Sequence, residues 1–272
     1  MTTIGFAGCS FTYGDGLDYY EGSKETSRFS HLVASHFNIE SLNQSFRGGS
    51  HTQIIKWWES FFQDNTVDAF VFQITMWMRS DSPVVPGTSH IDVMRKHEKT
   101  FVAWLEEHDI TLDDYLEQSK RDDVLHILNF LQKHQHKFPI YILCWPSIIL
   151  PYIKEHEWFL DKMIPLHYKN ETYETISDLM GNPLRPIKLN LLTEMLASIP
   201  KSLSFDESKN LIFNTGEIFQ VVESLRPELT IATDYVNFKK SRRDYHPSKL
   251  CHEVIAQSII TRMEHDNIFQ TK

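Results

Sequence analysis

Three short apolar runs, separated by segments with helical periodicity, constrain the fold of this chain more than any other feature. The runs cover residues 3–7, 69–74 and 139–144, and each has the length and composition of a buried β-strand. Nearly continuous apolar strands are typical of a parallel sheet that is covered on both faces. The alternation of strand and helix predicts right-handed crossovers, and therefore an α/β fold: a three-layer α/β/α sandwich around a central, mostly parallel sheet.

Apolar residues at helical spacing fill the intervals between these runs. The segments with this spacing are 29–37, 54–62 and 124–131. A short additional strand is predicted at 39–43. Pro247 stands at an expected first helical position, and the apolar face that follows it predicts a C-terminal helix. Prolines interrupt residues 151–232, and no fifth strand is placed there.

The chain has 272 residues, enough for one elaborated domain over 1–272 with a sizeable core. We expect insertions at about 80–121 and within 151–232, where polar and proline-rich sequence departs from the strand–helix alternation. These insertions are expected to cover the end of the sheet at which the strands finish, because loops leave the sheet there.

Composition restricts the partners. A formal net charge of −9 argues against binding along a phosphate backbone, so no nucleic-acid partner is expected. No apolar run approaches the length that crosses a bilayer, and the N-terminus lacks the pattern of a secretory signal, so we expect no membrane partner and a cytoplasmic location. The three cysteines fit neither a disulfide framework nor a metal spacing, and the histidines are scattered, so reduced cysteines, no metal and no cofactor are expected. The oligomeric state is left open.

A serine follows the first apolar run directly, in the stretch Gly8-Cys9-Ser10-Phe11-Thr12. The end of a central parallel strand lies at the edge where open α/β sheets bind ligands, and a flanking glycine lets the backbone turn sharply there. Ser10 is therefore the candidate nucleophile. The alternative is a plain strand-to-loop turn in which the Ser10 hydroxyl bonds only neighbouring backbone.

Partners for such a serine occur elsewhere in the chain. A serine hydroxyl needs a base, and the base works best beside a carboxylate, which His246 and Asp244 could supply. The backbone N–H groups of Ser10 and Gly48, on two strand-end loops, are candidates for stabilising an oxyanion. Alternatively, His246 caps the C-terminal helix and Asp244 pairs with a neighbouring arginine on the surface.

The order of these residues resembles that of the SGNH (GDSL-like) hydrolase family. Residues 8–12 look like its first block, 43–48 like its second, with Gly48 as the oxyanion glycine, and 244–248 like its last. Cys9 stands where the family usually has aspartate, and in this respect the chain resembles phage-encoded members that read Gly-Cys-Ser-Phe-Thr. The resemblance implies a serine esterase or acyl hydrolase that acts on a small ester or an acylated carbohydrate.

Two positions depart from the family pattern. The third block, usually Gly-x-Asn-Asp, is here residues 75–78, so the asparagine that would donate to the oxyanion is missing. Losing one such donor costs roughly 3–4 kcal/mol of transition-state stabilisation, and Thr75 or Arg79 is the expected substitute. Arg79 could equally pair with Asp15 or another carboxylate. The family's aspartate stands three residues before the histidine, where this chain has Arg243.

Two other functions compete with the esterase. One is a non-catalytic SGNH-like binding or structural module, which the missing asparagine favours; a virus-encoded module of this kind would be associated with the virion. The other is a nucleotide-binding protein that uses the loop 14–16. No phosphate-binding glycine motif accompanies that loop, so this function is disfavoured.

Overall fold

A four-stranded parallel sheet lies at the centre of the computed structural model, which describes residues 2–15, 17, 24–181, 226–233 and 242–269. Its strands are β1 (Thr3–Gly8), β2 (Glu40–Ser45), β3 (Ala69–Ile74) and β4 (Ile140–Cys144), in the order β2-β1-β3-β4. All neighbouring pairs are parallel. The predicted strands are therefore confirmed, including the short one after the first helix.

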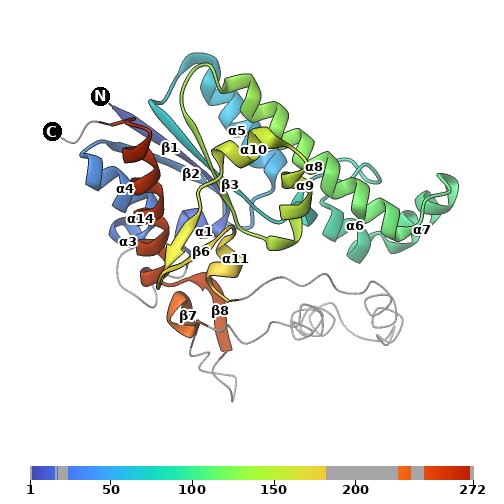
Figure 1. Cartoon of the computed structure of the whole chain (residues 1–272). Helices are drawn as coiled ribbons and strands as arrows, with labels where there is room; N and C mark the ends of the chain where they lie inside the picture. The colour runs from blue at the N-terminus through green and yellow to red at the C-terminus, as the bar shows by residue number, and fades with distance from the viewer. Residues whose placement is uncertain (1, 16, 18–23, 182–225, 234–241, 270–272) are drawn as a thin grey trace.

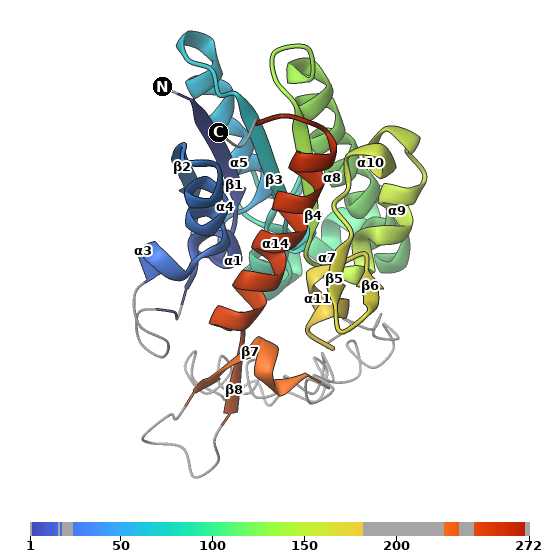
Figure 2. The same ribbon diagram turned by 60° about the vertical axis from the view of Figure 1, so that its left-hand side comes forward.

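Helices cover both faces of this sheet (Figures 1 and 2). On one face lie α4 (Phe29–Phe37) and α14 (Lys249–His265). On the other lie α5 (His51–Asp64), α8 (Leu112–His134) and α10 (Glu157–Lys162). The predicted three-layer α/β/α sandwich is confirmed.

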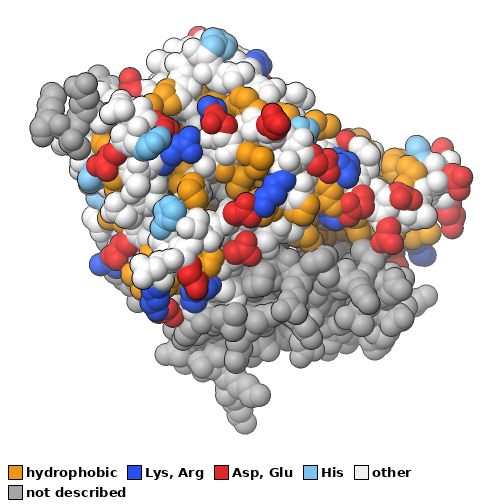
Figure 3. All heavy atoms as spheres, viewed as in Figure 1, with side chains coloured by type: hydrophobic (Ala, Val, Ile, Leu, Met, Phe, Trp, Pro, Cys, Tyr) orange, Lys and Arg blue, Asp and Glu red, His pale blue; other side chains and the backbone are white. Residues whose placement is uncertain are grey.

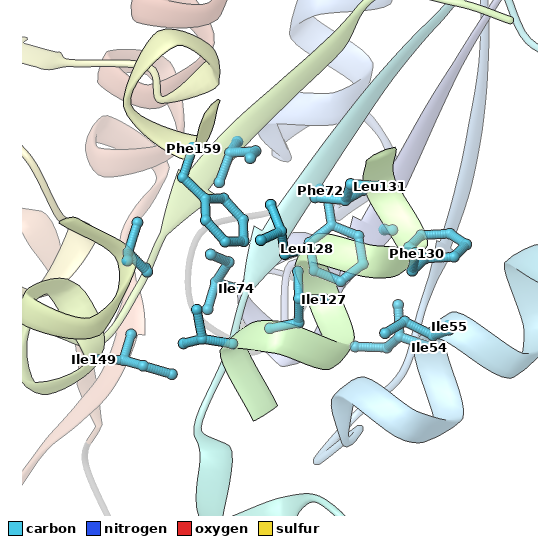
Figure 4. Packing of buried hydrophobic residues seen from close by; sticks show 14 of the residues in the cluster. Ile54, Ile55, Phe72, Ile74, Ile127, Leu128, Phe130, Leu131, Ile149 and Phe159 are labelled. Carbon is cyan, nitrogen blue, oxygen red and sulfur yellow. The ribbon is translucent and has the colours of Figure 1, made fainter. Parts of the chain in front are cut away.

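Side chains of the central strands alternate between two cores. Phe70, Phe72 and Ile74 of β3 pack with α5 and α8, whereas Ala69 and Val71 pack with the layer of α4 and α14. Figure 4 shows the first core, in which apolar side chains of α5, β3, α8 and α10 meet. Gln73 falls on the second face by the same alternation, although it is polar and fully buried.

The first predicted insertion contains α6 (His90–Lys96), α7 (Glu98–Glu107) and the beginning of α8. Helices α6 and α8 both contact η1 (Trp77–Arg79), the 3-10 turn that follows β3. The helical spacing predicted at 124–131 belongs to a longer continuous helix, α8, that begins within the expected insertion. The helix does not break there because no glycine or proline interrupts residues 112–134.

The second predicted insertion is described only in part. After β4 come η2 (Ser147–Ile149), α9 (Leu150–Lys154) and α10, then an antiparallel pair, β5 (Leu166–Tyr168) and β6 (Glu171–Tyr173), and α11 (Ile176–Leu179). Residues 182–225 lie outside the described part of the chain.

A second antiparallel pair precedes the C-terminal helix. It consists of β7 (Thr230–Thr233), which follows η4 (Pro227–Leu229), and β8 (Arg242–Pro247). The prediction that Pro247 is the first helical residue is wrong: Pro247 ends β8. Ser248 is the N-cap of α14, and its hydroxyl accepts a hydrogen bond from the N–H of Cys251, so the helix starts two residues later, at Lys249.

Two further observations bear on the composition. All three cysteines, Cys9, Cys144 and Cys251, are free and buried, as predicted. Within the described ranges, no helix combines the length and the apolar character that spanning a bilayer requires. On the face seen in Figure 3, acidic and basic side chains are interspersed.

Candidate active site

Ser10 lies at the start of a single helical turn, α1 (Ser10–Tyr13), that leaves the end of β1. Gly14 ends this turn in the left-handed region, at φ 80°. The contact of the Ser10 hydroxyl is Cys9 Sγ at 4.0 Å, and no nitrogen or oxygen of the described residues bonds it. A turn serine tied to its own backbone, the alternative to a nucleophile, is therefore not what the structure shows.

The amide of Gln73 fixes the turn that carries Ser10. Its Oε1 accepts hydrogen bonds from Thr12 N at 3.2 Å and Thr12 Oγ1 at 2.5 Å, and its Nε2 lies 3.5 Å from Cys9 Sγ. These groups leave no room for a side chain at Gly8, because a Cβ built there would meet Gln73 Oε1 at 2.7 Å. The glycine before the serine is thus required by close packing.

Asn43 ties the same turn to the second strand. Its Nδ2 donates to Thr12 O at 2.9 Å and to Ser30 Oγ at 2.7 Å, and its Oδ1 accepts from Ser45 Oγ at 2.6 Å. The predicted second block therefore has a structural role besides the position of Gly48. It holds α1 against β2 and α4.

Two backbone donors at this edge of the sheet have no partner. Gly8 lies opposite Ser45 in the parallel register, so the loops that carry Ser10 and Gly48 leave adjacent strands. Gly48 is exposed, with φ 68° and no atom within 4 Å of a built Cβ. Neither the Ser10 N–H nor the Gly48 N–H makes a hydrogen bond with a described residue. Unpaired N–H groups at adjacent strand ends are what an oxyanion site requires.

His246 reaches this region from β8. Its ring lies edge-on to Phe11, the residue after Ser10, with ring centroids 5.3 Å apart. The structure thus brings the predicted base to the helix of the predicted nucleophile. No hydrogen bond joins Ser10 and His246 in this structure. Hydrogen bonds between catalytic residues are often long or absent when no substrate is bound. Asp244 belongs to β8, and its side chain lies outside the described part.

Among the side chains that the structure describes, Asp15 places a carboxylate near His246. Its Oδ2 lies 4.0 Å from His246 Nε2, and Arg47 holds the same group through Nε at 3.0 Å and Nη2 at 2.9 Å. The predicted alternative in which Arg79 pairs with Asp15 is wrong, because Arg47 takes that place. Sequence reasoning missed the pairing, since nothing in the spacing of residues 15 and 47 indicates it.

Thr75 and Arg79, the predicted substitutes for the missing asparagine, lie in different environments. Thr75 is fully buried, and its hydroxyl has no hydrogen-bond partner. Arg79 is half-buried, with its guanidinium carbon 5.6 Å from the centre of the Trp145 ring. Of the two side chains, only Arg79 is accessible to a bound molecule in this conformation.

A buried network that sequence reasoning missed joins the loops after β2 and β3. His51 Nδ1 lies 2.6 Å from Asp123 Oδ2, and Asp123 Oδ1 accepts from Ser80 Oγ at 2.5 Å. Thr75 N–H donates to His51 Nε2 at 2.7 Å, so His51 carries its proton on Nδ1 and donates it to Asp123. This network fixes the loop that carries Arg79. One signal was available: Asp123 falls on the apolar stripe of α8, four residues before Ile127.

Two other buried groups are poor candidates for catalysis. Burial, with smaller effects of His246 and Arg28, lowers the pKa of His252 to about 3, so its ring is neutral, and its Nδ1 accepts from Phe29 N–H. Burial raises the pKa of the Cys144 thiol, which disfavours the thiolate. In the described ranges, no three His, Cys, Asp or Glu side chains are grouped as metal ligands.

Comparisons with known proteins give structural neighbours only. No protein-family model and no curated protein matches the chain. It is similar to a member of the lipolytic protein G-D-S-L family from Veillonella parvula, with 11% identity over 96% of this chain and 97% of that one, at a TM-score of 0.41. The chain is also similar to TesA, with 7% identity over 97% of this chain and 99% of that one, at a TM-score of 0.44. A family two carbohydrate esterase from Clostridium thermocellum is 10% identical over 99% of this chain and 65% of that one, at 0.42. With likenesses of this size, no residue or substrate is assigned to this chain.

Proposed function

We propose that this chain is a serine esterase of the SGNH (GDSL-like) type that removes an acyl group from a small ester or an acylated carbohydrate. Ser10 is the nucleophile, His246 the base and Asp244 the group that orients it. The backbone N–H groups of Ser10 and Gly48 bind the oxyanion. The proposal rests on the residue blocks around these positions and on the geometry of the strand-end loops.

The proposed reaction uses these groups in sequence. Ser10 Oγ attacks the ester carbonyl while His246 takes the hydroxyl proton, and the negative charge that develops on the carbonyl oxygen meets the two backbone N–H groups. The tetrahedral intermediate collapses as His246 returns the proton to the leaving alcohol. Water, activated by His246, then releases the acid and regenerates the Ser10 hydroxyl.

One observation carries this proposal. A serine hydroxyl without a competing partner stands beside two unpaired backbone N–H groups, where two adjacent parallel strands end. A plain structural turn usually satisfies such groups internally. The interlocked Gln73, Thr12 and Asn43 hold the turn in place, which is the rigidity that a preorganised oxyanion site needs.

The third oxyanion donor is proposed to be Thr75 or Arg79. Thr75 would have to be uncovered before a substrate oxygen reached its hydroxyl, whereas Arg79 is half-buried. Asp15, which lies near His246, is a second carboxylate that could stabilise the protonated base.

A non-catalytic SGNH-like binding module, including a virus-encoded one, is the second candidate. The absence of a hydrogen bond between the described side chains of Ser10 and His246 and the missing asparagine of the third block favour it. It predicts that the loops after β1 and β2 bind a ligand without cleaving it.

Hydrolysis assays separate the two functions. The purified protein would be incubated with 4-nitrophenyl acetate and with a fully acetylated monosaccharide, beside Ser10→Ala and His246→Gln. The esterase predicts turnover that both substitutions abolish while the thermal midpoint of unfolding stays within a few degrees. No turnover of either ester, or equal turnover by Ser10→Ala, would remove the esterase.

A further inference from the structure

Arg79 has no counter-charge among the residues that the structure describes. Its Nη1 is buried without a hydrogen-bond partner, and no carboxylate of the described residues lies within ion-pair distance of its guanidinium. Buried guanidinium groups are normally paired, because an unpaired buried charge is costly. Arg121 shows the usual arrangement in the same molecule: it lies over the Tyr152 ring and pairs with Glu155.

Neighbouring groups restrain the Arg79 side chain and the turn that carries it. One face of its guanidinium lies near the Trp145 ring, which limits the positions that the side chain adopts. Arg79 lies in the 3-10 turn η1. The next residue, Ser80, is hydrogen-bonded to Asp123, which also bonds His51, and this buried network restrains the turn. Arg28 also has an unpartnered Nε, but its Cβ packs beside Gly14 and it has no ring beneath it.

A chain of ring contacts connects Arg79 to the proposed catalytic residues. The Trp145 ring lies 4.4 Å from the ring of Phe11, and Phe11 in turn lies 5.3 Å from His246. Ser10 directly precedes Phe11. These contacts place the partly exposed Trp145 ring between Arg79 and the turn that carries Ser10.

We propose that Arg79 binds a carboxylate of the substrate, so that the preferred ester carries a negatively charged group a few carbons from the scissile bond. This inference rests on the proposed function of Ser10. A planar guanidinium suits a carboxylate because two parallel N–H groups match its two oxygens. The Trp145 ring, which is only partly buried, contacts the methylene groups between the carboxylate and the ester. Asp15 does not compete, because Arg47 neutralises it.

The test compares two esters that differ only in charge. Mono-(4-nitrophenyl) glutarate carries a free carboxylate, and its methyl ester masks that group. We expect the wild type to prefer the charged ester in kcat/KM by roughly 10- to 100-fold, the range of a charge-assisted hydrogen bond. Arg79→Gln should lower kcat/KM on the charged ester far more than on its methyl ester, so that the preference falls to less than about threefold. The matched control, Arg121→Gln, removes one charge over a ring and should keep the wild-type preference.

Other outcomes overturn the inference. Equal rates on both esters in the wild type would show that no charge is recognised. An equal loss on both esters in Arg79→Gln would assign Arg79 to the oxyanion instead. If the wild type hydrolyses neither ester, the proposed esterase activity is refuted, and the carboxylate subsite is tested separately by calorimetric titration with monomethyl glutarate. Binding that Arg79→Gln removes would support the subsite. No binding, or equal binding by the wild type and Arg79→Gln, would exclude the subsite.

Discussion

Removing the Asp123 carboxylate should destabilise the protein strongly. Its two oxygens accept from His51 Nδ1 and Ser80 Oγ, and the His51 and Asp123 side chains are 0% and 3% exposed. Asp123→Ala leaves both donors buried without an acceptor. Each orphaned donor costs about 1–3 kcal/mol, so the two together cost about 2–6 kcal/mol; no ion pair is lost, because His51 is neutral when its Nε2 accepts from Thr75 N–H. We therefore expect the free energy of unfolding to fall by about 2–6 kcal/mol.

Two further substitutions show whether the loss of stability comes from this network or from a general perturbation of α8. Asp123→Asn keeps an oxygen for His51, and its amide can donate to Ser80, whose hydroxyl also accepts, so we expect a loss of only about 1 kcal/mol. The control is Asp122→Ala, which removes the adjacent carboxylate, an exposed group bonded to Gln118. Its effect should stay within about 0.5 kcal/mol.

The measurement is urea unfolding followed by circular dichroism and by tryptophan fluorescence, with linear extrapolation where the two transitions coincide. A double-mutant cycle with His51→Leu should show coupling, so that the combined loss is smaller than the sum of the two single losses. A loss in Asp123→Ala no larger than in Asp122→Ala would refute the reasoning, as would strict additivity in the cycle.

The remaining predictions concern glycines and buried histidines. Gly8→Ala forces a methyl group into the Gln73 amide and should abolish soluble expression or activity. In Gly48→Ala the new methyl group meets no atom, so the free energy of unfolding, measured in urea, should fall by only about 1 kcal/mol because of the positive φ. Burial lowers the pKa of His134 to about 4 and of His252 to about 3, from the usual 6.5. Their neutral forms therefore add stability that is fully present above about pH 6.5 and is lost as pH falls toward 3–4. His134→Phe should reduce the steepness of this loss in unfolding curves at pH 7.5, 6 and 4.5; an unchanged pH profile would contradict it.

The architecture could be predicted from the sequence because it follows from local pattern. The apolar runs at 69–74 and 139–144 and the helical spacing at 29–37 each encode one element, and short crossovers leave little choice of topology. The predicted start of α14 was wrong by two residues, because Pro247 suits a first helical position but Ser248 provides the hydroxyl cap, so that the helix begins at Lys249.

The site was predictable only where a short motif carries it. Ser10, Gly48 and His246 stand in such motifs, and the structure places the first two at adjacent strand ends and the third against Phe11. The partners that hold these residues are distant in sequence. Gln73 and Asp123 are single polar residues in apolar elements, and their partners become clear only when the strands and helices are packed.

The most direct test of the esterase is reaction with a fluorophosphonate probe, followed by intact mass measurement and peptide mapping. An activated serine reacts with such a probe, whereas an ordinary surface serine does not, because the reaction needs both the base and the oxyanion donors. We predict one adduct, on the peptide that contains Ser10, absent in Ser10→Ala and much slower to form in His246→Gln. No adduct, or an adduct on another residue, would contradict the central claim and favour the non-catalytic module.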